Sequence, residues 1–246
     1  MTVVNNKLYV LRDRDPINVY TTTDFTHLRH FTVADADPAA LEDIASCPRK
    51  RCIYVSSSGG KCIHRLGLDD SVSKWPLRGA PTTLSVMRNS NLLSVSINSV
   101  DHLKKMMVIN SENGECLLET GPEGLRRDID IHLSDTVQLN NDTFAIVYGK
   151  SGKSAVSHVE KGGRILRSSN RDASMIDPFR MVTDGNDFLL VADVEINGVI
   201  VFDPSLEYVG DLAEGTVTKP CALYYDDVSR RLYVGQQNGK IVVIQL

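Results

Sequence analysis

One stretch, Asp177–Leu212, constrains the fold most strongly, because it divides into four short apolar segments separated by turn residues. The segments are rich in Val, Ile, Phe and Tyr, and they are Phe179–Val182, Phe188–Val191, Val199–Phe202 and Tyr208–Leu212. The intervening turns contain Asp-Gly-Asn, Asn-Gly and Asp-Pro. This composition and punctuation predict an antiparallel meander of four strands. One such sheet cannot bury both of its faces, so we expect further copies beside it.

Apolar segments like the second one of this unit recur along the chain, each ending in a valine. These valines are Val10, Val55, Val95, Val147, Val191 and Val234, and consecutive ones are 45, 40, 52, 44 and 43 residues apart. A repeat of about 40–45 residues with four strands per repeat is typical of a β-propeller. The sequence therefore predicts an all-β fold, a six-bladed β-propeller of four-stranded antiparallel blades.

The predicted blades fill the chain as a single domain, residues 1–246. Their approximate bounds are 2–33, 40–78, 82–119, 129–167, 177–212 and 221–246. Blade six contains only three predicted strands, so it is short of one. Two explanations are open: the chain is a segment of a larger protein, or the blade has an exposed edge. Its last strand contains the β-prone run Ile241–Ile244, and an open edge there predicts self-association by strand pairing.

Composition narrows the class of protein further. The chain has 246 residues, of which 42% are hydrophobic, and no run of about 18 apolar residues predicts a membrane span. A formal net charge of −4 argues against a general polyanion binder. Five cysteines and no charged-then-apolar leader predict reduced thiols in a cytoplasmic protein. No cofactor is expected.

Blade five resembles an NHL repeat. The pattern of that family is carried by Pro178, Asp184-Gly185, Leu190–Asp193, Asn197, Val199 and Val201–Asp203. Blade six matches in part through Pro220, Asp226 and Leu232–Gly235, whereas blades three and four depart widely. The chain is thus similar to the C-terminal propeller of tripartite-motif (TRIM) NHL proteins. That resemblance implies recognition of protein or RNA partners, with ubiquitin-ligase chemistry carried by a separate RING domain whose cysteine-histidine array this sequence lacks.

The function predicted from these features is a non-catalytic interaction scaffold that binds a protein partner. The TRIM resemblance implies that it is the substrate-recognition part of a larger ubiquitin-ligase-type protein. Loops on a rigid scaffold commonly carry such sites, so we look first at Asp101–Lys105 and Lys150–Lys153.

RNA binding is the first alternative. A basic stretch carries Lys150, Lys153, Lys161, Arg164, Arg167 and Arg171 against the single acid Glu160. Basic side chains along one rim would contact a phosphate backbone. The aromatic residues that would stack on bases make up 6% of the chain and fall mostly in predicted strands, where a core role is expected.

A metal-dependent hydrolase or lactonase of the six-bladed type is the second alternative. Its candidate acidic and amide ligands are Glu42, Asp43, Asn98, Asp130, Asp135 and Asp184, and nothing in the sequence shows that they converge. Cys47, Cys52, Cys62 and His64 form a weak candidate zinc site without the usual paired C-x-x-C spacing. The Gly149–Ser154 segment ends in GKS but has valine where a phosphate-binding loop needs its first glycine, so it predicts a turn.

Overall fold

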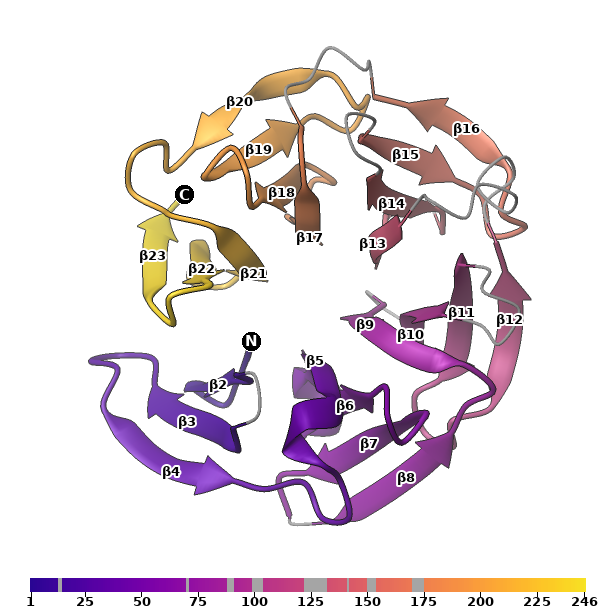
Figure 1. Ribbon diagram of the computed structural model, residues 1–246, viewed down its shortest axis with the longest axis vertical. Coiled ribbons are helices and arrows are strands. Elements are labelled where there is room, and N and C mark those ends of the chain that lie inside the picture. The colour runs from indigo at the N-terminus through magenta and orange to yellow at the C-terminus, as the bar shows by residue number, and fades with distance from the viewer. Residues whose placement is uncertain are drawn as a thin grey trace. The chain divides into compact units, whose positions relative to one another are not determined.

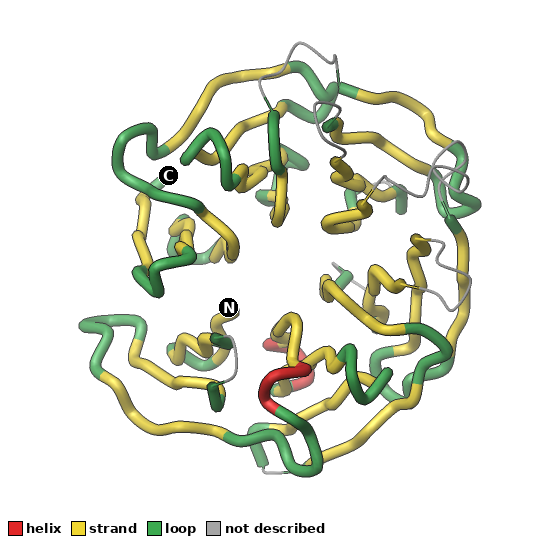
Figure 2. The backbone as a smooth tube through the Cα atoms, in the orientation of Figure 1, coloured by secondary structure: helices red, strands yellow, loops and turns green. Residues whose placement is uncertain are grey.

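The computed structural model describes residues 1–12, 15–69, 71–87, 91–98, 104–121, 132–140, 142–149, 154–169 and 175–246. It confirms the predicted fold class: the chain is an all-β, six-bladed β-propeller (Figure 1). Figure 2 shows strands and turns along nearly the whole described chain. The helical segments among these residues are two short 3₁₀ turns, η1 (Pro38–Ala40) and η2 (Pro48–Lys50), neither of which is long or apolar enough to cross a membrane.

The first five blades have four antiparallel strands each, and the sixth has three, as predicted. The strands of blades one to three are β1 Thr2–Val4, β2 Lys7–Val10, β3 Ile17–Thr21, β4 His27–Phe31, β5 Leu41–Cys47, β6 Cys52–Ser57, β7 Cys62–Gly67, β8 Val72–Pro76, β9 Ala80–Val86, β10 Leu92–Asn98, β11 Lys104–Asn110 and β12 Cys116–Thr120. Those of blades four to six are β13 His132–Gln138, β14 Phe144–Gly149, β15 Ala155–Val159, β16 Ile165–Ser168, β17 Pro178–Thr183, β18 Leu189–Asp193, β19 Gly198–Phe202, β20 Tyr208–Leu212, β21 Pro220–Asp226, β22 Arg231–Gln236 and β23 Ile241–Gln245.

The blades are distributed over two compact units. One unit comprises Met1–Leu103 and Met107–Glu119, and it holds blades one and two with most of blade three. The other comprises Lys104–Met106 and Thr120–Leu246, and it holds blades four to six. That the whole chain is one domain stays a prediction.

Within each unit the hydrophobic core lies between consecutive blades. Strand β6 shows why: Ile53 and Val55 belong to a cluster with blade-one residues, whereas Cys52 and Tyr54 belong to a cluster with blade-three residues. Because both faces of the strand are covered, its side chains are buried without the usual alternation. Outermost strands such as β4 have mostly exposed side chains. Each blade thus depends on its neighbours for burial.

Two aspartates join neighbouring blades at equivalent places. Asp43 follows a bulge in the first strand of blade two. Its carboxylate accepts a hydrogen bond from the N–H of Ile44 and another, 2.9 Å long, from the N–H of Leu84 in blade three. Asp135 does the same in blade four, accepting the N–H of Thr136 and, at 2.9 Å, that of Met181 in blade five. These bonds tie the innermost strands of successive blades together.

A third aspartate organises blade five from within. Asp193, which the NHL resemblance singled out, is fully buried at the end of β18. One carboxylate oxygen accepts the N–H groups of Ile176 and Asp177, and the other accepts those of Glu195 and Ile196. The carboxylate therefore fixes both the entry to β17 and the turn after β18. In blade six, Gln236 stands at the equivalent position and accepts the N–H of Thr218.

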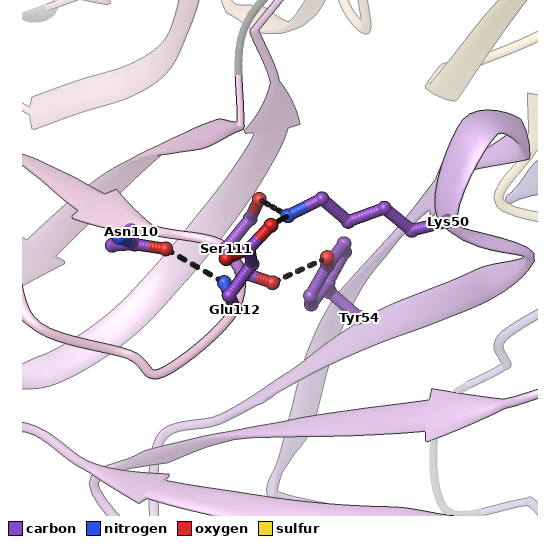
Figure 3. A network of polar contacts seen from close by, with 5 residues as sticks. All are labelled: Lys50, Tyr54, Asn110, Ser111 and Glu112. Carbon is purple, nitrogen blue, oxygen red and sulfur yellow. Dashed lines mark hydrogen bonds and ion pairs between the residues drawn. The ribbon is translucent and has the colours of Figure 1, made fainter.

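Polar contacts also link the turns of blades two and three (Figure 3). Lys50 donates to Ser111 Oγ at 2.9 Å and pairs with Glu112 at 3.2 Å. The hydroxyl of Tyr54 donates to the Ser111 carbonyl oxygen at 2.9 Å, and the N–H of Glu112 donates to the Asn110 side chain. Burial raises the pKa of Tyr54, so its hydroxyl keeps the proton that it donates. The network fixes the β11–β12 turn against blade two.

Replacing Asp193 tests how much blade five depends on this carboxylate. Asp193→Ala leaves four backbone N–H groups without their acceptor, so we expect the free energy of unfolding to fall by about 3 kcal/mol. Urea unfolding followed by circular dichroism measures the change. Glu195→Ala, an exposed acid in the same turn, is the control and is expected to stay within about 0.5 kcal/mol of the parent. Equal losses for the two variants would contradict the role assigned to Asp193.

Candidate interaction surface

Two large apolar side chains stand exposed at the start of blade five. Ile176 is 54% exposed and Phe179, on the innermost strand β17, is 42% exposed. The guanidinium of Arg180 lies over the Phe179 ring, 5.0 Å from its centroid. We call Ile176, Phe179 and Arg180 the Phe179 patch. Four other exposed apolar residues, Leu28, Val72, Leu117 and Leu166, lie one to an outermost strand, which is ordinary for a protein surface. Tyr208 and Val209 are exposed next to one another on the outermost strand β20.

The backbone beneath the Phe179 patch is held firmly. The N–H of Ile176 donates to Asp193 at 2.7 Å, and its carbonyl oxygen accepts from Ser154 Oγ at 3.1 Å. The patch residues therefore project from a backbone that is fixed on both sides of the peptide. A fixed backbone lowers the conformational entropy lost when a partner binds.

A β-bulge explains why Phe179 is exposed although it lies in an apolar strand. The register of β17 against β18 shifts between Pro178 and Arg180, so Phe179 has no partner residue there. Met181, two residues further on, is buried in the core between blades four and five. Regular alternation would place Phe179 on the same buried face as Met181. The expected core role is therefore wrong for Phe179, and no sequence signal marks the bulge.

Strand β17, which carries Arg180, lies beside β21 (Pro220–Asp226) of blade six. Burial raises the pKa of the Cys221 thiol on β21, and the nearby Arg180 charge opposes that rise. The patch thus borders the junction of blades five and six, which belong to the same unit.

The predicted RNA-binding residues are only partly described. Lys150, Lys153 and Arg171 lie outside the described residues, as do most of the loops predicted to carry the site, 101–105 and 150–153. Lys161 lies exposed in the turn before β16. Arg164 forms an ion pair with Glu160 at 2.8 Å, and Arg167 on β16 forms one with Glu207 at 2.7 Å. Each of these guanidiniums already faces a carboxylate, which reduces its attraction for phosphate.

The candidate zinc residues are divided between two faces of blade two. Cys47 pairs with Cys52 across β5 and β6, on the face that packs against blade three. Cys62 and His64 lie opposite Ser57 and Val55, and Val55 belongs to the core shared with blade one. Residues opposite one another on antiparallel strands share a face. The structure therefore brings Cys62 and His64 together, with Sγ and Nε2 3.3 Å apart, and leaves Cys47 and Cys52 on the other side of the sheet.

The acids considered for a hydrolase have other partners. Asp43 and Asp135 accept backbone N–H groups between blades. Asp184 accepts the N–H groups of Asn186 and Phe188 in a turn, and Glu42 accepts from the Ser58 hydroxyl. Asp130 lies outside the described residues. Among the residues that the structure describes, no three His, Cys, Asp or Glu side chains are grouped to hold a metal ion.

Comparison with known proteins supports the fold alone. No family model matches the chain, and no curated protein matches it in sequence. Hydrazine synthase from Kuenenia stuttgartiensis is similar in structure, with a TM-score of 0.72, 15% identity, and coverage of 100% of this chain and 82% of that one. A protein of unknown function from Bacteroides caccae is similar with a TM-score of 0.71 and 15% identity, and the match covers 98% of this chain and 90% of that one.

A further similar structure is a catalytically inactive virginiamycin B lyase from Staphylococcus aureus with quinupristin. Its TM-score is 0.68 at 14% identity, and the match covers 95% of this chain and 74% of that one. Known propellers of this shape therefore include enzymes. At such low identity their activities do not transfer to this chain.

The five thiols differ in exposure, which predicts an order of reaction with an aromatic disulfide reagent. Cys116 is exposed and should react first, Cys221 more slowly, and Cys47, Cys52 and Cys62 only after denaturation. Burial, with Glu119, raises the pKa of Cys116, so its rate should keep increasing as pH rises above the ordinary thiol value. Absorbance of the released thiolate measures each phase. Persistence of the fast phase in Cys116→Ser would contradict this order.

Proposed function

We propose that this chain is a non-catalytic interaction module whose Phe179 patch binds a protein partner. The observation that carries the proposal is the exposure of Ile176 and Phe179 within four residues, with the Arg180 guanidinium stacked on the Phe179 ring. Aromatic residues and arginine are enriched at protein interfaces and among the residues that dominate binding energy. The partner is expected to present an apolar side chain that covers Ile176 and the free face of the ring.

The contacts of the acidic residues support a binding role over catalysis. Asp43 and Asp135 hold backbone amides together between blades, so their carboxylates have a structural use. The NHL resemblance of blade five points in the same direction, and Asp193, its aspartate, serves the packing of that blade. We place the chain, on that resemblance, among recognition propellers of the TRIM-NHL kind that act in the cytoplasm as part of a larger protein.

Alanine substitution in the patch tests the proposal. The parent chain and the Phe179→Ala variant are used to recover cross-linked proteins, and each recovered protein is then purified and titrated against both. Loss of the ring should weaken binding of the true partner by roughly tenfold, or about 1.4 kcal/mol, as expected for an aromatic residue at the centre of an interface. Because Phe179 is already partly exposed, its replacement should change stability little.

Val228→Ala is the matched control. Val228 is 95% exposed in the turn between β21 and β22. The substitution therefore removes exposed apolar surface at a place remote in sequence from the patch. The partner should bind this variant as it binds the parent. If no purified partner distinguishes Phe179→Ala from Val228→Ala, the Phe179 patch is not the binding surface.

The RNA alternative makes a different prediction about salt and charge. If the RNA alternative holds, a random single-stranded RNA pool binds more weakly as salt increases, and the double variant Arg164→Glu, Arg167→Glu abolishes that binding. The ion pairs of these arginines with Glu160 and Glu207 lead us to expect no sequence enrichment at either of two salt concentrations. Salt-sensitive enrichment that the double variant removes would replace the protein-binding proposal with RNA binding.

A further inference from the structure

Blade two contains a pocket that the preceding functions do not use. Its volume is about 330 Å³, near the lower end of the roughly 300–1,000 Å³ typical of small-molecule sites. Its lining includes Asp35 and Asp37 from the segment before β5, Ser57 at the end of β6, and Gly60 in the turn after it. Cys62 and His64 on β7 and Lys74 on β8 complete the part of the lining that matters here. All of them belong to one unit of the structure.

Comparison with blade five shows how the pocket arises. The strand registers make Ser57 equivalent to Asp193, because Ser57 pairs with Leu41 as Asp193 pairs with Pro178. The turns that follow also correspond: Ser58 donates to the Ala40 carbonyl as Val194 donates to the Asp177 carbonyl. Gly60 is then equivalent to Ile196, which packs against the core of blades four and five. Blade two thus has the Ser57 hydroxyl where blade five has the Asp193 carboxylate. It has only a hydrogen at Gly60 where blade five has the branched apolar side chain of Ile196.

The hydrogen bonds of blade two replace those of Asp193 only in part. In blade five the carboxylate accepts four N–H groups, those of Ile176, Asp177, Glu195 and Ile196. In blade two the side chain of Asp37 accepts the N–H of Ala39 at 3.0 Å, and Ser57 Oγ accepts that of Gly60 at 3.3 Å, a long bond. The space beside Gly60 is tight, because a Cβ there would lie 3.0 Å from Ser57 Oγ and 3.1 Å from Cys62 Sγ.

The inner wall of the pocket is neutral. Cys62 and His64 are both 1% exposed, with Sγ and Nε2 3.3 Å apart. Burial raises the pKa of the Cys62 thiol and lowers the pKa of His64, and the charge of Lys74 lowers both. The pair is therefore an uncharged thiol and an uncharged imidazole near neutral pH. Nδ1 of His64 is buried without a hydrogen-bond partner among the described residues, so the imidazole retains unused polar capacity at this wall.

The charges around the pocket have both signs. Asp35 and Asp37 precede β5 on one side, and Lys74 lies on β8, where it pairs with His64. A pure anion would meet two carboxylates, and a pure cation would meet an ammonium group. A small zwitterion satisfies both charges.

We propose that the blade-two pocket binds a small free α-amino acid. Its carboxylate takes the charge of Lys74 and lies beside the Gly59–Gly60 turn. Its ammonium group lies toward Asp35 and Asp37. The site is independent of the Phe179 patch, which lies in the other unit.

Titration with L-valine followed by nuclear magnetic resonance tests the proposal. The chain has 17 glycines, so selective ¹⁵N-glycine labelling gives a spectrum simple enough to follow Gly59 and Gly60. We expect saturable shifts of these two signals at millimolar L-valine, with Gly185 in the blade-five turn unmoved. N-acetyl-L-valine lacks the ammonium group and L-valinamide lacks the carboxylate, so each should bind roughly tenfold more weakly, as loss of a charge-assisted hydrogen bond predicts.

Ser57→Asp rebuilds the blade-five arrangement and should abolish the shifts, because the new carboxylate fills the ligand position. Ser205→Asp makes the same charge change at an exposed turn and should leave binding intact. If Ser57→Asp does not fold, Lys74→Gln, at an exposed side chain, should weaken L-valine binding roughly tenfold. Absence of saturable shifts, equal binding of the three ligands, or unchanged binding by both pocket variants would overturn the proposal.

Discussion

The structure depends on the acceptance of backbone amides by a few buried or partly buried side chains. A propeller blade begins with an innermost strand that must be placed against the blade before it and held to its own second strand. Asp43 and Asp135 perform the first task, and Asp193 and Gln236 perform the second. Charge-assisted bonds of this kind are stronger than neutral ones, and the groups they satisfy would otherwise be costly to bury. The apolar cores between blades then pack around fixed backbones.

The two surfaces proposed here follow from local departures from that scheme. At the Phe179 patch, a bulge in β17 moves one aromatic side chain out of the core while Asp193 keeps the adjoining backbone in place. In blade two, a serine stands where blade five has that aspartate, and a pocket remains between the entry segment and the turn. A repeat fold makes such differences interpretable, because equivalent positions in other blades show what a filled site looks like.

Similarity of fold alone does not assign a function to this chain. Similar propellers include a lyase and hydrazine synthase, at 14% and 15% identity, and the fold is therefore shared by proteins of unrelated chemistry. For this chain, function has to be argued from its own side chains. Those side chains include an ion-paired arginine on β16, a neutral thiol–imidazole pair in blade two, and an exposed aromatic residue with a stacked guanidinium.

The sequence by itself determined the fold class, the six blades and the three-stranded last blade, because a repeat of apolar segments and turns depends on local composition and spacing. Through the NHL resemblance it also singled out Asp193, and it named Cys62 and His64 among the candidate zinc residues. Only the tertiary structure decided the exposure of Phe179 and the partners of Arg164 and Arg167. It also decided the separation of Cys47 and Cys52 from Cys62. Bulges, strand registers and contacts between distant turns set these features, and they depend on how whole strands pack.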